Sequence, residues 1–234
     1  TAGFLVDNRE MWFVPIINPD GYAYNETIAP NGGGMHRKNR RPNPNNSNCN
    51  NGAQQGVDLN RNYSYNWGVN NSGSSGNPCS AVYRGTSAFS EAETEAISDF
   101  ILLRQFKNVL HYHSYSNVLI HSWGDNTLPD EPDLSTLREI GAEMTRVNGY
   151  EVGTGMETIG YGVNGDAVDW TYGTAGLISF TPEVGSYSDN FWPSEDRVVP
   201  LCQDQIHSNK VFALLAGSDY IVYNSQLDNQ FPAI

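Results

Sequence analysis

A few histidine and glutamate side chains could carry acid–base or metal chemistry. His111 and His113 are two residues apart in an expected strand, so both side chains point to one face. That spacing can hold a metal ion, although one exposed and one buried structural histidine explain a bare H-x-H better. Glu183 ends the apolar run GLISFTPEV, at the strand end where α/β proteins place ligand sites. A partly desolvated carboxylate there could act as a base, or it could be an ordinary surface glutamate.

Arginine and asparagine side chains point to a second kind of chemistry, the binding of a carboxylate. An arginine cluster begins at Arg37, and Asn60 directly precedes Arg61. A guanidinium fork beside an amide suits two-point binding of a carboxylate, although a solvated loop would also explain the pattern. Tyr161 lies between two glycines that would let its loop move, unless it simply packs.

Several classes of protein are excluded by motif or composition. The sequence has no H-E-x-x-H, C-x-x-C or G-x-S-x-G motif, which argues against a zincin and a common serine hydrolase. Its net charge of −13, from 26 acids and 13 bases, makes nucleic acid and anionic membranes poor partners. No apolar run approaches the roughly 20 residues of a membrane-spanning helix.

The elements that must position these residues alternate between strand and helix, which predicts an α/β sheet. Residues 25–89 are mostly Gly, Asn, Pro and Ser and predict a long irregular region, of a kind that is usually either functional or disordered. Ser90 and Glu93 have the spacing of a capping box that would open a helix. The expected elements are strands at 10–17, 107–114, 117–123 and 176–182, a turn at 18–21, and helices at 90–105, 133–147 and 196–216.

Taken together, an ordered set of motifs resembles the zinc metallocarboxypeptidases of the pancreatic carboxypeptidase A/B and bacterial carboxypeptidase T kind. The motifs are NPDGY, HRKNR, GVDLNRNY, PCSAVYRG, HSYS, DWTYG and SFTPE, at compatible spacings over residues 1–216. The resemblance implies one α/β domain with a mixed, mostly parallel, twisted sheet flanked by helices. Its site would lie at the carboxyl ends of the strands, ringed by residues 25–89, with a cis Ser114–Tyr115 bond.

The resemblance assigns the chemical roles residue by residue. His113 matches a ligand of the one zinc ion, Glu183 matches the base that takes a proton from the zinc-bound water, and Arg37 matches the group that steadies the oxyanion. Asn60 and Arg61 match the pair that grips the free C-terminal carboxylate of a peptide or protein substrate. These roles together imply a hydrolase that removes C-terminal residues.

Substrate selection would depend on a mobile Tyr161 and on a pocket for the terminal side chain. An apolar, roomy lining favours aliphatic or aromatic residues, while Asp166 at the pocket edge would allow basic ones, as in some bacterial relatives. The residues expected to line this pocket are Ile120, Gly124, Met156, Val163, Val168 and Thr181.

Cysteine use suggests an oxidising compartment. Cys49 and Cys79 look like the loop disulfide of the family, which implies a secreted or periplasmic protein. Cys202 lies in an apolar helical stretch, where we expect a buried free thiol.

The resemblance also reveals a missing motif. The first two zinc ligands of the family lie in a His-x-x-Glu motif upstream of the strand expected near Glu10, and this sequence contains none. We therefore expect residues 1–217 to form an incomplete catalytic domain and residues 218–234 a tail or linker. The upstream section could be a separate partner, and the chain alone would be inactive. The alternative is a metal-free module that binds peptide C-termini, although retention of Glu183, Tyr161 and His113 favours an enzyme.

Overall fold

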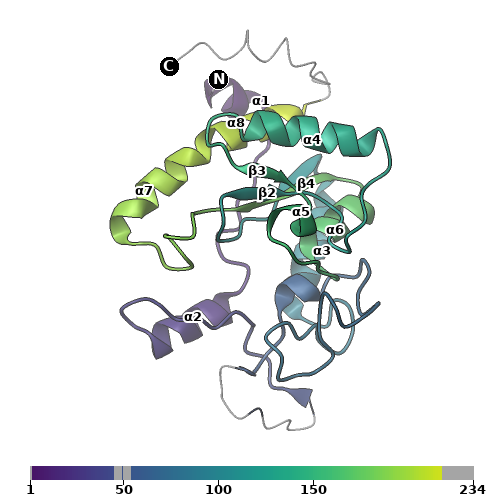
Figure 1. Cartoon of the computed structure of the whole chain (residues 1–234), viewed down its shortest axis with the longest axis vertical. Coiled ribbons are helices and arrows are strands. Elements are labelled where there is room, and N and C mark those ends of the chain that lie inside the picture. The colour runs from purple at the N-terminus through teal and green to yellow at the C-terminus, as the bar shows by residue number, and fades with distance from the viewer. Residues whose placement is uncertain (1, 45–48, 50–53, 218–234) are drawn as a thin grey trace.

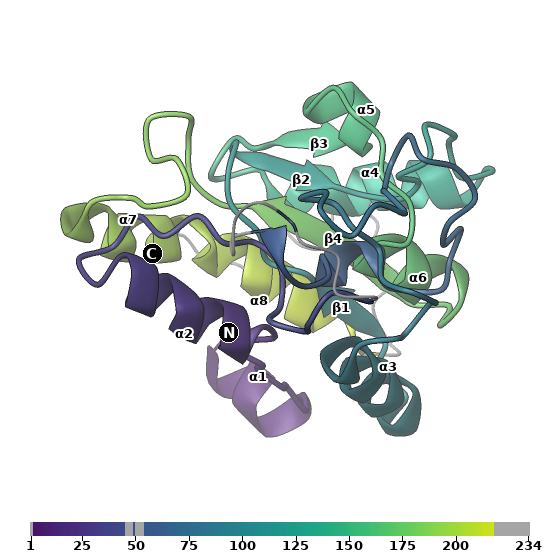
Figure 2. The same cartoon turned by 90° about the horizontal axis from the view of Figure 1, so that it is seen from below.

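The computed structural model describes residues 2–44, 49 and 54–217. Its centre is a four-stranded sheet in the order β1-β4-β2-β3. β4 (Ile178–Glu183) pairs in parallel with β1 (Asn108–Leu110) and antiparallel with β2 (Val118–Ile120), and β2 pairs in parallel with β3 (Glu151–Gly153). Figure 2 shows the strands in this order. The expected mixed, mostly parallel sheet of an α/β domain is thereby confirmed.

Helices cover both faces of the sheet (Figure 1). One face carries α4 (Asp133–Met144) and α8 (Ile206–Leu215), and the other carries α3 (Ala92–Arg104) and α6 (Ala167–Gly173). The remaining helical elements are α1 (Ala2–Asn8), α2 (Pro19–Ile28), η3 (Leu59–Arg61), α5 (Gly155–Thr158) and α7 (Glu195–Asp204).

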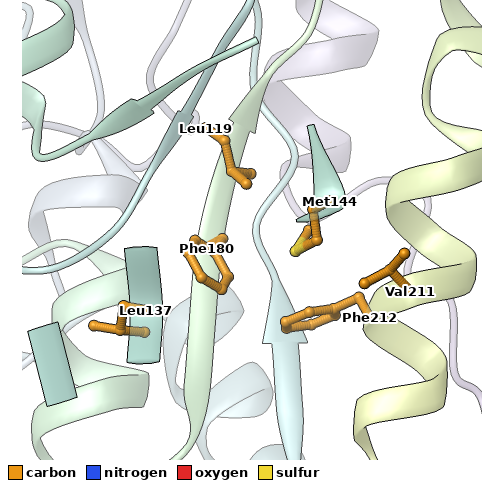
Figure 3. Close-up of a cluster of buried hydrophobic side chains, with 6 residues drawn as sticks. All are labelled: Leu119, Leu137, Met144, Phe180, Val211 and Phe212. Atoms are coloured by element: carbon orange, nitrogen blue, oxygen red, sulfur yellow. The ribbon is translucent and has the colours of Figure 1, made fainter. Parts of the chain in front are cut away.

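The sheet is held by an apolar core on each face. Leu119 and Phe180 from the strands meet side chains of α4 and α8 (Figure 3). A second cluster joins Trp170 of α6 to Ile101 of α3 and Tyr63 of the irregular region. Burial of such side chains stabilises a fold by about 1.5–3 kcal/mol each. The two clusters therefore fix α6 and β4, whose ends border the site described below.

The strand predicted at residues 10–17 is not formed. This segment has no regular structure, and its apolar side chains are largely exposed, although Trp12 packs edge-on against Phe100. No strand in the described part of the chain pairs with it, and Pro15 has no amide hydrogen to donate. The turn expected at 18–21 is the start of α2, where the side chain of Asn18 accepts a hydrogen bond from the amide of Gly21 at 3.0 Å.

Two helix details also differ from the prediction. The prediction of a capping box at Ser90 and Glu93 is wrong. The Ser90 hydroxyl instead donates to the Glu91 carboxylate at 2.7 Å, and α3 has no side-chain cap. The single helix expected over 196–216 is two helices, α7 and α8, which meet at Gln205. Cys202 is a free thiol as expected, but it is exposed rather than buried, and Leu201 is the buried residue of α7.

The irregular character of residues 25–89 is confirmed where the structure describes them. Their regular structure consists of the end of α2 and short 3-10 turns such as η3. A disulfide joins Cys49 to Cys79, and the Ser114–Tyr115 bond is cis, both as expected. Within the described residues no helix has the length and apolar character needed to cross a membrane. The predicted tail at 218–234 lies outside them.

Candidate active site

A cavity of about 240 Å³ brings together nearly all of the predicted site residues. Met156 is the exception: it lies on the one-turn helix α5, does not line the cavity and is 43% exposed. The predicted residues that do line it are Arg37, Asn60, Arg61, His113, Ile120, Gly124, Tyr161, Val163, Asp166, Val168, Thr181 and Glu183.

Parallel pairing places His113 beside Glu183. The amide of His113 donates to the carbonyl of Pro182 at 2.9 Å, which extends the β1–β4 pairing past the end of β1. The carboxyl ends of parallel strands share one edge of a sheet, so both side chains enter the cavity together. Nδ1 of His113 lies 4.0 Å from Oε1 of Glu183.

Burial shifts both groups toward their neutral forms. It lowers the pKa of His113 to about 4, with Arg37 acting in the same direction. It raises the pKa of Glu183 to about 7, although the charge of Arg37 opposes that change. A neutral imidazole has a lone pair to offer a metal ion, and a carboxylate that titrates near neutral pH can both accept and return a proton.

Arg37 is oriented by an aspartate that the sequence analysis gave no role. Its Nε donates to Oδ2 of the buried Asp58 at 2.8 Å, and the other oxygen of Asp58 accepts the amide of Asn60 at 3.1 Å. Burial alone would raise the pKa of Asp58, but Arg37 and Arg61 hold it below its ordinary value. Asp58 therefore stays ionised and fixes the guanidinium. In the sequence, the one feature that points to this role of Asp58 is its position two residues before Asn60.

Asn60 and Arg61 are fixed within η3 by backbone groups. Nε of Arg61 donates to the carbonyl of Gly73 at 2.8 Å, and one of its terminal nitrogens donates to the carbonyl of Asn60 at 2.7 Å. The side-chain oxygen of Asn60 accepts the amide of Ala167 at 2.9 Å, which ties η3 to the start of α6. These bonds hold a buried cation and an amide at the cavity wall, as two-point carboxylate binding requires.

Tyr161 stands at the cavity mouth and is 54% exposed. Gly160 on one side has φ of +79°, a conformation that a side chain would strain, and no atom lies near its missing Cβ. Gly162 on the other side is packed closely against Asn126. The chain therefore has open space at Gly160 and close packing at Gly162. This arrangement would suit a tyrosine that moves over a bound residue.

The cavity lining also includes apolar side chains and a buried carboxylate. Ile120, Val163 and Val168 supply the apolar walls, and Asp166 supplies a buried carboxylate. His121 also lines the cavity, and burial lowers its pKa. The sequence analysis assigned no role to His121, since a histidine inside an apolar strand has no local signature.

The residues present fit only part of a zinc site. A catalytic zinc ion takes three protein ligands and leaves one position open. His113 supplies one imidazole, but no group of three or more His, Cys, Asp or Glu side chains occurs among the described residues. His111 does not join it, because its Nε2 lies 3.1 Å from the hydroxyl of Thr171. The described residues alone therefore do not make a complete zinc site.

Comparison with known proteins shows the family. The sequence profile of zinc carboxypeptidases matches residues 2–208, so the chain belongs to the zinc carboxypeptidase family. Carboxypeptidase B of Astacus astacus is 34% identical over 227 residues, which cover 92% of this chain and 70% of that protein. A zinc carboxypeptidase of Simulium vittatum is 33% identical over 96% of this chain and 72% of its own length.

Solved structures agree with this assignment. Carboxypeptidase A from Helicoverpa armigera superposes with a TM-score of 0.74 at 29% identity, over 88% of this chain and 52% of its own. Bovine thrombin-activatable fibrinolysis inhibitor, solved with a tick carboxypeptidase inhibitor, gives a TM-score of 0.76 at 27% identity, over 88% and 69% of the two chains. The chain thus spans between half and about 70% of the length of these relatives.

Proposed function

We propose that this chain carries the substrate-binding and proton-transfer groups of a zinc-dependent carboxypeptidase, which hydrolyses the C-terminal peptide bond of peptides or proteins. The observation that supports this most is the shared cavity. The Asn60–Arg61 pair, which suits a terminal carboxylate, opens into the same space as His113 and Glu183. Family membership supports the same reaction class.

The roles of the side chains follow from their environments. Glu183 would take a proton from the attacking water and return it to the leaving amine, since its pKa of about 7 suits both steps. Arg37, held by Asp58, would stabilise the negative charge that develops on the carbonyl oxygen. Zinc, when bound with His113 as a ligand, would polarise the carbonyl and activate the water. Arg61 would exclude peptides without a free terminal carboxylate, because their binding would leave its buried cation unpaired.

The finer properties of this function are also proposals. Apolar walls at Ile120, Val163 and Val168 support a preference for aliphatic or aromatic C-terminal residues, and Asp166 supports acceptance of Lys or Arg. The Cys49–Cys79 disulfide supports a secreted or periplasmic location.

Activity would need zinc ligands that residues 1–234 do not supply as a His-x-x-Glu motif. We propose that residues 1–217 are part of a catalytic domain that an upstream section, in the same chain or as a separate piece, completes. The absence of a three-ligand group among the described residues also favours the second candidate, a metal-free module that binds C-termini. Hydrolysis after addition of zinc and the upstream section would separate the two functions.

Ligand binding by calorimetry tests the shared part of both candidates. We expect N-acetyl-phenylalanine to bind at least about tenfold more tightly than its carboxamide, because only the acid pairs with Arg61. R61K should remove most of that difference, since lysine lacks the guanidinium fork. R138K is the matched control, because Arg138 forms an exposed pair with Glu157 on the outer surface. Equal binding of acid and amide, or normal discrimination by R61K, would refute the carboxylate clamp.

A further inference from the structure

Helix α2 lies against the segment that carries Arg37, residues 36–38, and not against the apolar core. None of the apolar clusters in the described part of the chain contains a residue of α2, and Gly21 is the one buried residue of the helix. An isolated helix of this length is marginal in water, so α2 depends on the contacts that it makes with its surroundings.

Two asparagine side chains connect α2 to the backbone of this segment. Asn18, the N-cap, and Asn25 are about two helical turns apart and therefore share one face of the helix. Nδ2 of Asn18 donates to the carbonyl oxygens of Lys38 at 3.1 Å and of Arg37 at 3.3 Å. Oδ1 of Asn25 accepts the amide of His36 at 2.8 Å, and its Nδ2 donates to the carbonyl of the same residue at 2.9 Å.

The backbone next to Arg37 is fixed by α2 and by the irregular region together. A Cβ added to Gly21 would lie 2.7 Å from the carbonyl oxygen of Lys38, the atom to which Asn18 donates, so the helix approaches this backbone closely. The side chain of Lys38 is buried, and its Nζ donates at 2.6–2.9 Å to three carbonyls of the irregular region, those of Gln54, Pro78 and Ser80.

The position of this backbone determines where the guanidinium of Arg37 can reach. The side chain lines the cavity, and its Nε donates to Oδ2 of Asp58 at 2.8 Å. Both contacts need the backbone of Arg37 at one distance from the cavity. A displacement of about 1 Å can cost a catalytic group roughly a hundredfold in rate, so the groups that hold this backbone matter for the reaction.

We propose that Asn18 is a positioning residue that acts through Arg37: its amide nitrogen holds the backbone so that the guanidinium meets both Asp58 and the cavity. This inference rests on the proposed function, in which Arg37 stabilises the charge on the carbonyl oxygen. The oxygen of Asn18 accepts the amide of Gly21 at 3.0 Å and caps α2, whereas its nitrogen binds the segment. Capping and positioning therefore use different atoms of one side chain.

The variant N18D separates these two tasks. Aspartate caps a helix as well as asparagine does, but it cannot donate to the carbonyls of residues 36–38. N148D is the matched control, because Asn148 bonds in the same way at a place outside the cavity lining. Its oxygen accepts the amide of Tyr150 at 3.2 Å, and its nitrogen donates to the carbonyl of Asp204 at 3.2 Å.

NMR of arginine side chains in the 234-residue protein measures the effect on Arg37. Its Nε–H signal, assigned by its loss in R37K, reports the bond to Asp58, and Arg197, in a second arginine–aspartate pair, is the internal reference. We expect N18D to raise the exchange rate of the Arg37 Nε–H with water about tenfold, the size expected for one lost hydrogen bond. The Arg197 signal should not change, and N148D should change neither signal.

Equal exchange at Arg37 in folded N18D and wild type would overturn the inference, as would fast exchange in the wild type itself. Should N18D not fold, N18S repeats the comparison, because serine also caps a helix but lacks the amide group and adds no charge.

A kinetic measurement connects this position to the reaction. In the enzyme completed with zinc and the upstream section, N18D should lower kcat about tenfold and leave KM within about twofold, since Arg37 would act on charge that forms only in the transition state. A changed Arg37 signal with an unchanged kcat would refute the role of Asn18 in the reaction. Equal binding of acid and amide ligands by the wild type would instead refute the proposed function, whatever the NMR comparison shows.

Discussion

Asp58 shows how a residue without a chemical role of its own can orient the site. It is buried, whereas the side chain of its partner Arg37 is 42% exposed to the cavity. Solvent near Arg37 therefore weakens the contribution of this ion pair to the free energy of unfolding. The carboxylate of Asp58 is nevertheless buried, and it stays ionised because Arg37 is beside it.

We predict that D58N lowers the free energy of unfolding by about 1–3 kcal/mol at pH 7, because it removes a charge-assisted hydrogen bond to Arg37. The folded pKa of Asp58 lies below its ordinary value of 3.8. Its contribution is therefore complete above that value and is lost as pH falls through the folded pKa. Urea unfolding of wild type and D58N at a series of pH values measures this.

The difference between the two proteins should shrink at acid pH, while the exposed control D99N should follow wild type throughout. A difference that stays constant from pH 7 to pH 2 would contradict the ionic role of Asp58.

Sequence reasoning identified His113, Glu183 and the Asn60–Arg61 pair as candidate site residues. It did so because the motifs that contain them resemble those of zinc carboxypeptidases. It missed the roles of Asp58 and Asn18, because these depend on neighbours that are close only in space.

At the element scale, local pattern predicted β4 and the positions of α3 and α4 well, since the residues that form each element are contiguous in the sequence. It failed at residues 10–17, because a run of apolar residues becomes a strand only where another strand offers hydrogen bonds. It also merged α7 with α8, because the break at Gln205 has no glycine to mark it.

The irregular region contains a very close approach of two backbone segments at Gly56. Gly56 has φ of +97°, and a Cβ there would lie 1.9 Å from the carbonyl oxygen of Asn39. We predict that G56A costs more than about 3 kcal/mol or prevents folding, since strain at positive φ adds to a backbone clash. The matched control is G149A, with φ of +69° and open space around the missing Cβ, which should cost about 1 kcal/mol. Similar unfolding midpoints for the two variants would count against the close approach.

At the scale of the whole molecule, the fold class followed from alternating strands and helices together with the resemblance. The sheet order could not be read from the sequence alone, because β4, late in the chain, lies between β1 and β2. Long-range pairing of this kind leaves no local signal.

Stability of the whole chain should depend on the disulfide across the irregular region. Cys49 and Cys79 are 30 residues apart, so closing that loop should contribute about 3–4 kcal/mol. We predict that a C49S/C79S double variant unfolds at correspondingly lower urea concentration, while C202S, at the exposed free thiol, leaves the midpoint unchanged. An unchanged midpoint in the double variant would show that the loop is ordered without its crosslink.

The measurement that tests the account most directly is the zinc content of the 234-residue chain, purified without chelator and passed through a desalting column. Among the residues that the structure describes, His113 is the one zinc ligand that we assign, so we predict well under one zinc per chain and weak binding that H113A abolishes. One tightly held zinc per wild-type chain would contradict it, because further ligands would then have to lie within residues 1–234.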